Sequence, residues 1–125
     1  MYHLLLVMLG GAIGAGARHL TGRATLALWG PNFPWGTLIV NLAGGLAMGL
    51  LVGWLAARAS GDDALRYLLG VGVLGGFTTF SAFSLETATM LQRGEHMVAL
   101  LYILASVVGS VAALFAGLQL ARVAA

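Results

Sequence analysis

One stretch decides how this chain folds: Gly75-Gly76-Phe77-Thr78-Thr79-Phe80-Ser81-Ala82-Phe83-Ser84-Leu85-Glu86. It lies in the third of four hydrophobic segments, where a helix facing lipid would carry mainly Leu, Ile and Val. It carries instead two adjacent glycines, several hydroxyl side chains, phenylalanines and a carboxylate. Polar groups at membrane depth normally face a bundle interior or a water-filled path, and an ionisable one is a functional candidate. The stretch therefore predicts a membrane helix that lines something.

The composition excludes an ordinary soluble domain. The 125 residues are 60% hydrophobic and only 8% charged, and the mean hydropathy is +0.97, whereas soluble domains carry about 25% charged residues. The basic balance, with a pI near 9.7, comes from arginines that flank the apolar segments, so we expect no nucleic-acid partner. The absence of cysteine excludes disulfides and thiolate metal sites.

The pattern of uncharged segments predicts an all-α membrane protein with four transmembrane helices, all in one domain spanning residues 1–125. A helix needs roughly 20 apolar residues to cross a bilayer, and Pro31-Asn32-Phe33-Pro34 divides the one segment that is too long for a single span. Glycines spaced four apart, such as Gly10 and Gly14, predict close helix packing. We expect helices at about 2–28, 35–57, 64–92 and 96–122.

The third of these helices is expected to break near the midplane. Gly75-Gly76 followed by Thr78-Thr79 is poor helix material, because glycine costs about 1 kcal/mol relative to alanine and β-branched residues cost somewhat less. A break frees backbone carbonyls, which are tolerated in a membrane only when they are buried or line a cavity. Channels and transporters use such carbonyls to hold cations, and Na⁺ is a reasonable occupant.

Asn41 is the sole Asn or Gln in the middle of a span. Its amide could make a structural bond to a neighbouring helix or could line a path for a solute. The hydroxyls of Tyr102, Ser106 and Ser110 follow one helical face at intervals of four residues. Single serines often bond to their own backbone, but three aligned hydroxyls also suit a polar track.

Phe80, Phe83 and Glu86 share one face of the third segment. The phenylalanines could simply pack against a neighbouring helix. Alternatively, the positive edges of their rings could meet an anion without trapping it.

The arginines are balanced between the two sides of the membrane. Four spans place both termini on one side, so each side receives three arginines and no lysine: Arg58, Arg66 and Arg122 on one, Arg18, Arg23 and Arg93 on the other. Orientation normally follows a Lys/Arg excess on the cytoplasmic side. The balance is consistent with a fixed orientation set by other factors, and equally with dual topology, in which the chain inserts both ways and pairs with itself.

Three strings together resemble the signatures of the Fluc (CrcB) fluoride channels: Gly10-Gly11-Ala12-Ile13-Gly14-Ala15-Gly16-Ala17-Arg18, Gly36-Thr37-Leu38-Ile39-Val40-Asn41-Leu42-Ala43-Gly44, and Gly75-Gly76-Phe77-Thr78-Thr79-Phe80-Ser81 with Phe83 and Glu86. The resemblance covers the whole chain, including its length and its four-helix layout. The sequence departs from the family at Ala82, where Thr is frequent, and at His19, where an aromatic residue is common.

The resemblance implies an antiparallel, dual-topology homodimer with two fluoride pores along the subunit interface. It implies a central, structural Na⁺ held by the backbone carbonyls of Gly75 and Thr78. Arg18 matches the family's vestibule arginine, and Glu86 matches its third-helix carboxylate, whose role we leave unassigned. The pore residues that the resemblance implies are Asn41, Phe80, Phe83, Tyr102, Ser106 and Ser110.

The expected function is therefore passive export of fluoride through a channel in a bacterial inner membrane, with no enzymatic step. One alternative is a small, dual-topology, proton-coupled multidrug exporter that uses Glu86 as its coupling carboxylate. Another is a haem-bearing membrane anchor, which would need a pair of histidines facing each other within the bundle. His3, His19 and His96 lie near the expected span ends, which disfavours that alternative.

Overall fold

The computed structural model describes residues 1–58 and 63–124, and these contain four long apolar helical spans. Three of the spans are single helices: α1 (Tyr2–Trp29), α2 (Trp35–Arg58) and α6 (His96–Ala124). The remaining span, Asp63–Gln92, consists of α3 (Asp63–Leu65), the π-helix η1 (Arg66–Leu74), α4 (Gly75–Phe77) and α5 (Phe80–Gln92). The prediction of an all-α protein with four membrane-spanning helices is confirmed, and the chain is a multi-pass membrane protein.

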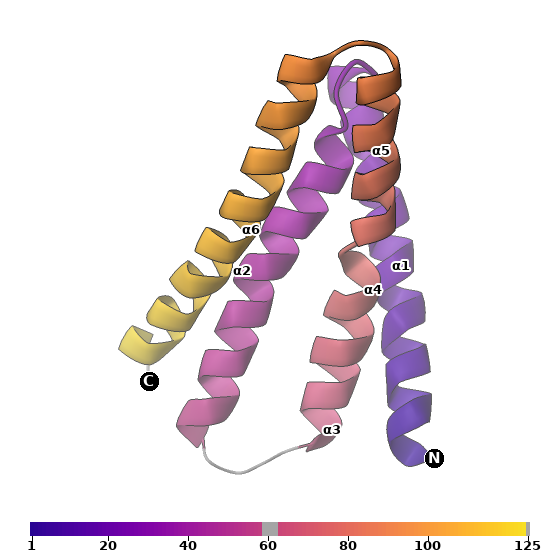
Figure 1. The fold of residues 1–125 in the computed structure, drawn as a ribbon. Helices are drawn as coiled ribbons and strands as arrows, with labels where there is room; N and C mark the ends of the chain where they lie inside the picture. The colour runs from indigo at the N-terminus through magenta and orange to yellow at the C-terminus, as the bar shows by residue number, and fades with distance from the viewer. Residues whose placement is uncertain (59–62, 125) are drawn as a thin grey trace.

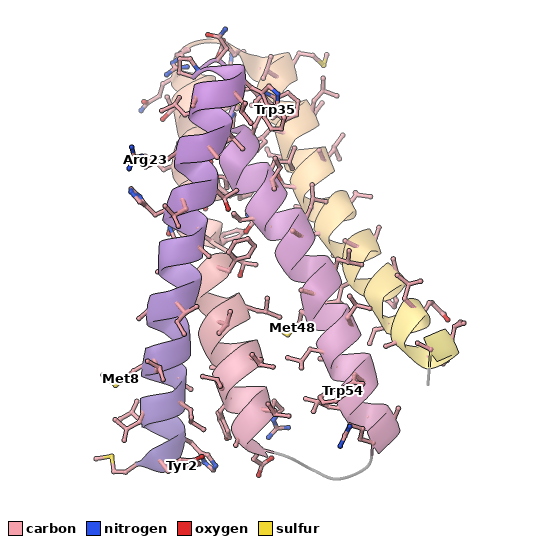
Figure 2. All side chains as sticks on the ribbon, turned by 180° about the vertical axis from the view of Figure 1, so that it is seen from behind. Tyr2, Met8, Arg23, Trp35, Met48 and Trp54 are labelled. Carbon is pink, nitrogen blue, oxygen red and sulfur yellow. The ribbon has the colours of Figure 1, made fainter. Side chains whose placement is uncertain are left out.

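The spans form two pairs that diverge toward one end of the molecule (Figure 1). In one pair α2 lies along α6, and in the other α1 lies along η1 and α4. Both termini lie at the end where the pairs are furthest apart. Trp35 and Trp54 lie at opposite ends of α2 (Figure 2), as expected for aromatic residues at the two membrane–water interfaces.

Glycines hold each pair together by letting the backbones approach closely. A methyl group on Gly14 of α1 would lie 2.8 Å from the Phe77 amide nitrogen, and one on Gly117 of α6 would lie 2.7 Å from the Leu50 amide nitrogen. Real Cβ atoms essentially never come so near. In lipid, where helices gain nothing from hydrophobic burial against each other, such packing drives their association. The glycine spacing in the sequence therefore has a direct packing cause.

Large apolar side chains cover most of the outer surface, and few lie inside. Leucine, valine and methionine side chains are exposed along α1 and α6, which suits a solvent of lipid tails. The inner cluster is small and centres on Tyr102, which is 0% exposed and packs against Phe83 and Phe33 with ring centroids 5.2 Å and 5.4 Å away. This cluster positions the polar residues described below.

The π-helical turns of η1 were not predicted from the sequence. The Gly75 N–H bonds the carbonyl of Gly70, five residues earlier, and also that of Gly72. Such wide turns are rare and often occur at functional sites. Here they immediately precede a break in the span. Gly70 and Gly72 are both buried, so the widened turns carry no side chains at the places where neighbouring spans come closest.

Candidate functional site

The third span is interrupted at two threonines. Thr78 (φ −79°, ψ 156°) and Thr79 (φ −151°, ψ 120°) have extended backbones between α4 and α5. Thr79 starts the second half, because its Oγ1 accepts a hydrogen bond from the Ala82 N–H at 3.2 Å. A threonine in this place is a favourable N-cap. The sequence therefore contains both the weak helix formers that end α4 and the cap that begins α5.

Asn41 of α2 holds the break in place. Its Nδ2 donates to the Thr79 carbonyl at 3.0 Å, and its Oδ1 accepts from the Thr79 N–H at 2.8 Å. The side-chain amide thus pairs with the Thr79 backbone as a second peptide group would. Without it, the N–H would lie at membrane depth with no helical partner, which is costly. The structural bond that was one alternative for Asn41 is therefore present.

The Gly75 and Thr78 carbonyls are among those at the break that have lost their helical donors. In a continuous helix the Gly75 carbonyl would accept from the Thr79 N–H, and the Thr78 carbonyl would accept from the Ala82 N–H. Those donors go instead to Asn41 Oδ1 and to Thr79 Oγ1. Gly75 is also exposed on the single chain. The two carbonyls are therefore available to a ligand from outside the helix.

Glu86 is bound by two hydroxyl groups from neighbouring helices. Thr37 Oγ1 of α2 donates to Glu86 Oε2 at 2.9 Å, and the Tyr102 hydroxyl of α6 donates to Oε1 at 2.8 Å. Glu86 therefore joins α2, α5 and α6 at one level, just beyond the Phe83 ring that packs on Tyr102.

A cavity of about 420 Å³ lies beside the break, between α2, α5 and α6. Five of the six predicted pore residues line it: Asn41, Phe80, Phe83, Ser106 and Ser110. The two phenylalanine rings lie 5.4 Å apart between centroids with an interplanar angle of 47°. Phe83 is 8% exposed, whereas Phe80 is 76% exposed. One ring is thus fixed in the core, and the other forms part of an open surface.

Ser106 offers an unused hydrogen bond inside this cavity. Its Oγ is buried and has no hydrogen-bond partner among the residues that the structure describes. An unsatisfied buried hydroxyl costs about 1–3 kcal/mol, so it needs a specific explanation. A small anion that accepts a hydrogen bond would satisfy it. The cavity therefore suits such an anion, with two phenyl rings and an unpartnered hydroxyl among its lining groups.

Four predicted site residues lie outside this cavity: Gly75 and Glu86, described above, and Tyr102 and Arg18. Tyr102 is buried behind Phe83, and its hydroxyl bonds Glu86. Arg18 lines a separate cavity of about 300 Å³ with His19, Arg23 and other residues, as a vestibule residue would. Its Nε also donates to the Gly76 carbonyl at 3.2 Å. The polar face of α6 is therefore divided between Ser106 and Ser110 in the cavity and Tyr102 at Glu86.

Sequence reasoning did not assign roles to Thr37 and Thr79, which make several of these contacts. Thr37 precedes Asn41 by one helical turn, so that one face of α2 presents both side chains to α5. That spacing was the available signal. For Thr79 the signal was the N-cap preference for threonine, but its backbone bonds to Asn41 cross 38 residues and cannot be inferred from local sequence.

The geometry does not favour a haem-bearing anchor. His3 lies at the beginning of α1 and stacks on Tyr67 with ring centroids 4.4 Å apart. His96 begins α6 at the opposite end of the bundle. Within residues 1–58 and 63–124, no group of three His, Cys, Asp or Glu side chains could hold a metal ion.

These features define a class of protein: a four-span membrane protein whose third span is interrupted beside a cavity of hydroxyl groups and phenyl rings. The chain belongs to the CrcB family, because its residues 5–118 match the model of the family described as "CrcB-like protein, Camphor Resistance (CrcB)".

Relatives of high identity extend over nearly the full chain. The sequence is similar to the "Fluoride-specific ion channel FluC" of Chelativorans sp. (strain BNC1), with 62% identity over 98% of both chains. It is 58% identical to the protein of that name from Caulobacter sp. (strain K31), over 98% of this chain and 96% of the relative. It is also 56% identical to the one from Sphingopyxis alaskensis, over 98% of this chain and 97% of the relative.

Proposed function

We propose that this protein is a fluoride channel that lets F⁻ leave the cell down its gradient. The observation that carries the proposal is the buried Ser106 hydroxyl, unpartnered within the described residues, in the cavity that Phe80 and Phe83 also line. The names of the relatives support the same function. A channel performs no chemical step, so the protein is not an enzyme.

The lining of the cavity fits a passive path for a small anion. An ion must bind well enough to enter and weakly enough to leave. Ring edges carry a partial positive charge without forming strong hydrogen bonds, and the Ser106 and Ser110 hydroxyls supply donors one turn apart along α6. No arginine lines this cavity, so the anion meets donors and ring edges in place of a fixed cation that would hold it.

We propose that the working unit is an antiparallel homodimer. On the single chain the cavity is bordered by the exposed Phe80 ring, and Gly75 at the break is exposed as well. A second copy that covers this face would enclose both. The balance of arginines between the two sides supports insertion in both orientations. Closed pairs with twofold symmetry use the same surface on both copies, so each pair would contain two equivalent fluoride paths.

A cysteine introduced at Asn32 should react from both sides of sealed vesicles. Asn32 is exposed in the connection between α1 and α2, and the chain has no other cysteine. With a membrane-impermeant maleimide, about half of the protein should be labelled before permeabilisation and the rest afterwards, because an antiparallel pair holds equal numbers of both orientations. Labelling that is complete, or absent, before permeabilisation would contradict dual topology.

We also propose that a structural Na⁺ lies at the centre of the pair. The fit rests on the two carbonyls, of Gly75 and Thr78, whose helical donors are diverted to Asn41 and Thr79. Hard cations prefer such oxygen ligands. Two antiparallel copies would present these carbonyls to each other. The ion would neutralise the carbonyl dipoles where the two breaks meet and so hold the pair together.

The cellular setting follows from the chemistry of a weak acid. HF crosses membranes in acidic surroundings and dissociates inside, so that F⁻ accumulates unless it has an exit. The relatives come from bacteria, and we place this protein in a bacterial inner membrane. The exposed leucines and valines of α1 and α6 would contact its lipid tails. The comparisons do not favour the alternative of a proton-coupled exporter.

Fluoride efflux from liposomes tests the proposal. Purified protein reconstituted into vesicles loaded with KF and KCl should release F⁻ once K⁺ can cross through an added ionophore, and it should retain Cl⁻. Protein-free vesicles are the control for leakage. Equal release of both anions, or release of neither, would contradict a fluoride channel.

A further inference from the structure

Arg18 does more than line a vestibule, because its side chain is tied to the broken span. Its Nε–H donates to the carbonyl of Gly76, a residue 58 positions further along the chain, at 3.2 Å. The contact is partly buried. The remaining donors of a guanidinium group, which has five N–H bonds in all, can still face the cavity that Arg18 shares with His19 and Arg23.

The position of Arg18 follows from the packing of α1. Gly14 lies one turn earlier on the same face, where a methyl group would come within 2.8 Å of the Phe77 amide nitrogen. A methyl group on Gly76 would come within 2.6 Å of the Gly11 carbonyl oxygen. The two backbones therefore touch at the end of α4, and a side chain one turn beyond Gly14 reaches the last carbonyls of that helix.

Gly76 is one of four consecutive residues at the break, 75–78, whose carbonyls lose the donors that a continuous helix would supply. In a continuous helix its partner would be the Phe80 N–H, but extended residues now separate it from α5. The Gly75 and Thr78 carbonyls have lost their donors to Asn41 and Thr79. Arg18 thus satisfies the Gly76 carbonyl, one of the two that lie between those of the predicted cation site. A cation near the C-terminal end of a helix also interacts favourably with the helix dipole.

We propose that Arg18 is a positioning residue for the cation site. By capping Gly76 through Nε, it fixes the end of α4 and with it the directions in which the neighbouring Gly75 and Thr78 carbonyls face the cation. This inference rests on the proposed Na⁺ site. It assigns to Arg18 a role that depends on one N–H donor at a defined position, whereas a vestibule role depends on positive charge.

Three substitutions separate the two roles. In Arg18→Gln the side-chain nitrogen is bonded to Cδ as Nε is in arginine, so the donor is kept and the charge is lost. Arg18→Lys keeps the charge but moves its nitrogen one bond further out. Arg18→Met keeps most of the length and provides neither. Two measurements use the full chain. In detergent, the rise in melting temperature with NaCl is compared with that in matched choline chloride. In liposomes, the Na⁺ concentration for half-maximal fluoride efflux is determined.

We expect Arg18→Gln to keep the wild-type response to Na⁺ within about threefold, and Arg18→Met to need about tenfold more Na⁺, as the loss of one hydrogen bond of ordinary strength predicts. The half-maximal Na⁺ concentration distinguishes a weakened cation site from a general loss of stability. A variant that is only destabilised would lose active protein at every Na⁺ concentration. If Arg18→Met does not fold, the comparison of Gln with Lys decides, and Gln must be closer to the wild type.

Two results would overturn the proposal. If Lys matches the wild type while Gln and Met are equally impaired, Arg18 acts through its charge in the vestibule. If all three variants respond to Na⁺ as the wild type does, the cap is irrelevant to the cation site. A wild-type protein with no response to Na⁺ would reject the cation site itself and the Arg18 role with it, while fluoride efflux would still test the channel.

Discussion

Replacing Asn41 with leucine is expected to reduce fluoride efflux by more than about 100-fold. The substitution removes both hydrogen bonds that hold Thr79 and leaves its backbone N–H without a partner at membrane depth. Each lost or unsatisfied group costs about 1–3 kcal/mol, and each 1.4 kcal/mol corresponds to about tenfold in rate. The break should shift or close, so that Phe80 and the carbonyls on either side lose their positions. Fluoride release from liposomes measures the effect.

Met48→Leu is the matched control for this substitution. Met48 lines the same cavity from the same helix but makes none of the bonds to the break. It should keep efflux within about threefold of the wild type, because exchanges between Met and Leu usually cost less than about 1.5 kcal/mol. Wild-type efflux in Asn41→Leu would show that the amide does not hold the pathway open.

Replacing Phe80 with leucine is expected to lower fluoride efflux by about tenfold without affecting the fold. The Phe80 ring is 76% exposed on the single chain, so the substitution removes little core packing. Leucine keeps an apolar side chain of similar reach but lacks the ring quadrupole. The geometry-specific contribution of an aromatic ring is about 0.5–1.5 kcal/mol, which at its upper end corresponds to about tenfold in rate. Initial rates of fluoride release at equal protein content measure the effect.

Phe115→Leu is the control for the loss of a ring. Phe115 of α6 is 62% exposed and does not line the cavity. Its replacement should leave efflux unchanged, since its ring would face lipid. If the two variants behave alike, the Phe80 ring does not meet the anion, and its function in this site would be packing against the partner copy alone.

The four spans and the interruption of the third were accessible from the sequence because their causes are local. Apolar length sets the spans, and paired glycines before β-branched threonines end α4 within a few residues. The N-cap of α5 is local as well. The π-helical turns of η1 were not accessible, because the pattern of apolar residues in Arg66–Leu74 is the same for a helix of either hydrogen-bond register.

The contacts that organise the site cross long distances in the chain and could not be inferred. Asn41 was identified as an amide that could bond to a neighbouring helix, but its partner Thr79 follows from how α2 packs against the break. The polar stripe on α6 was predicted from helical spacing, whereas Tyr102 bonds Glu86 because Phe83 separates it from the cavity. Helical periodicity gives the face of a side chain, while its partner depends on the packing of other helices.

Measuring the zero-current potential across a planar bilayer tests fluoride selectivity most directly. With fluoride tenfold higher on one side, and with chloride and pH equal on both, a channel selective for F⁻ should hold the potential near the fluoride equilibrium value, about 59 mV for one charge per ion. Adding a chloride gradient in either direction, or a pH gradient, should leave this value unchanged. A potential that follows the chloride or proton gradient would contradict a passive fluoride channel.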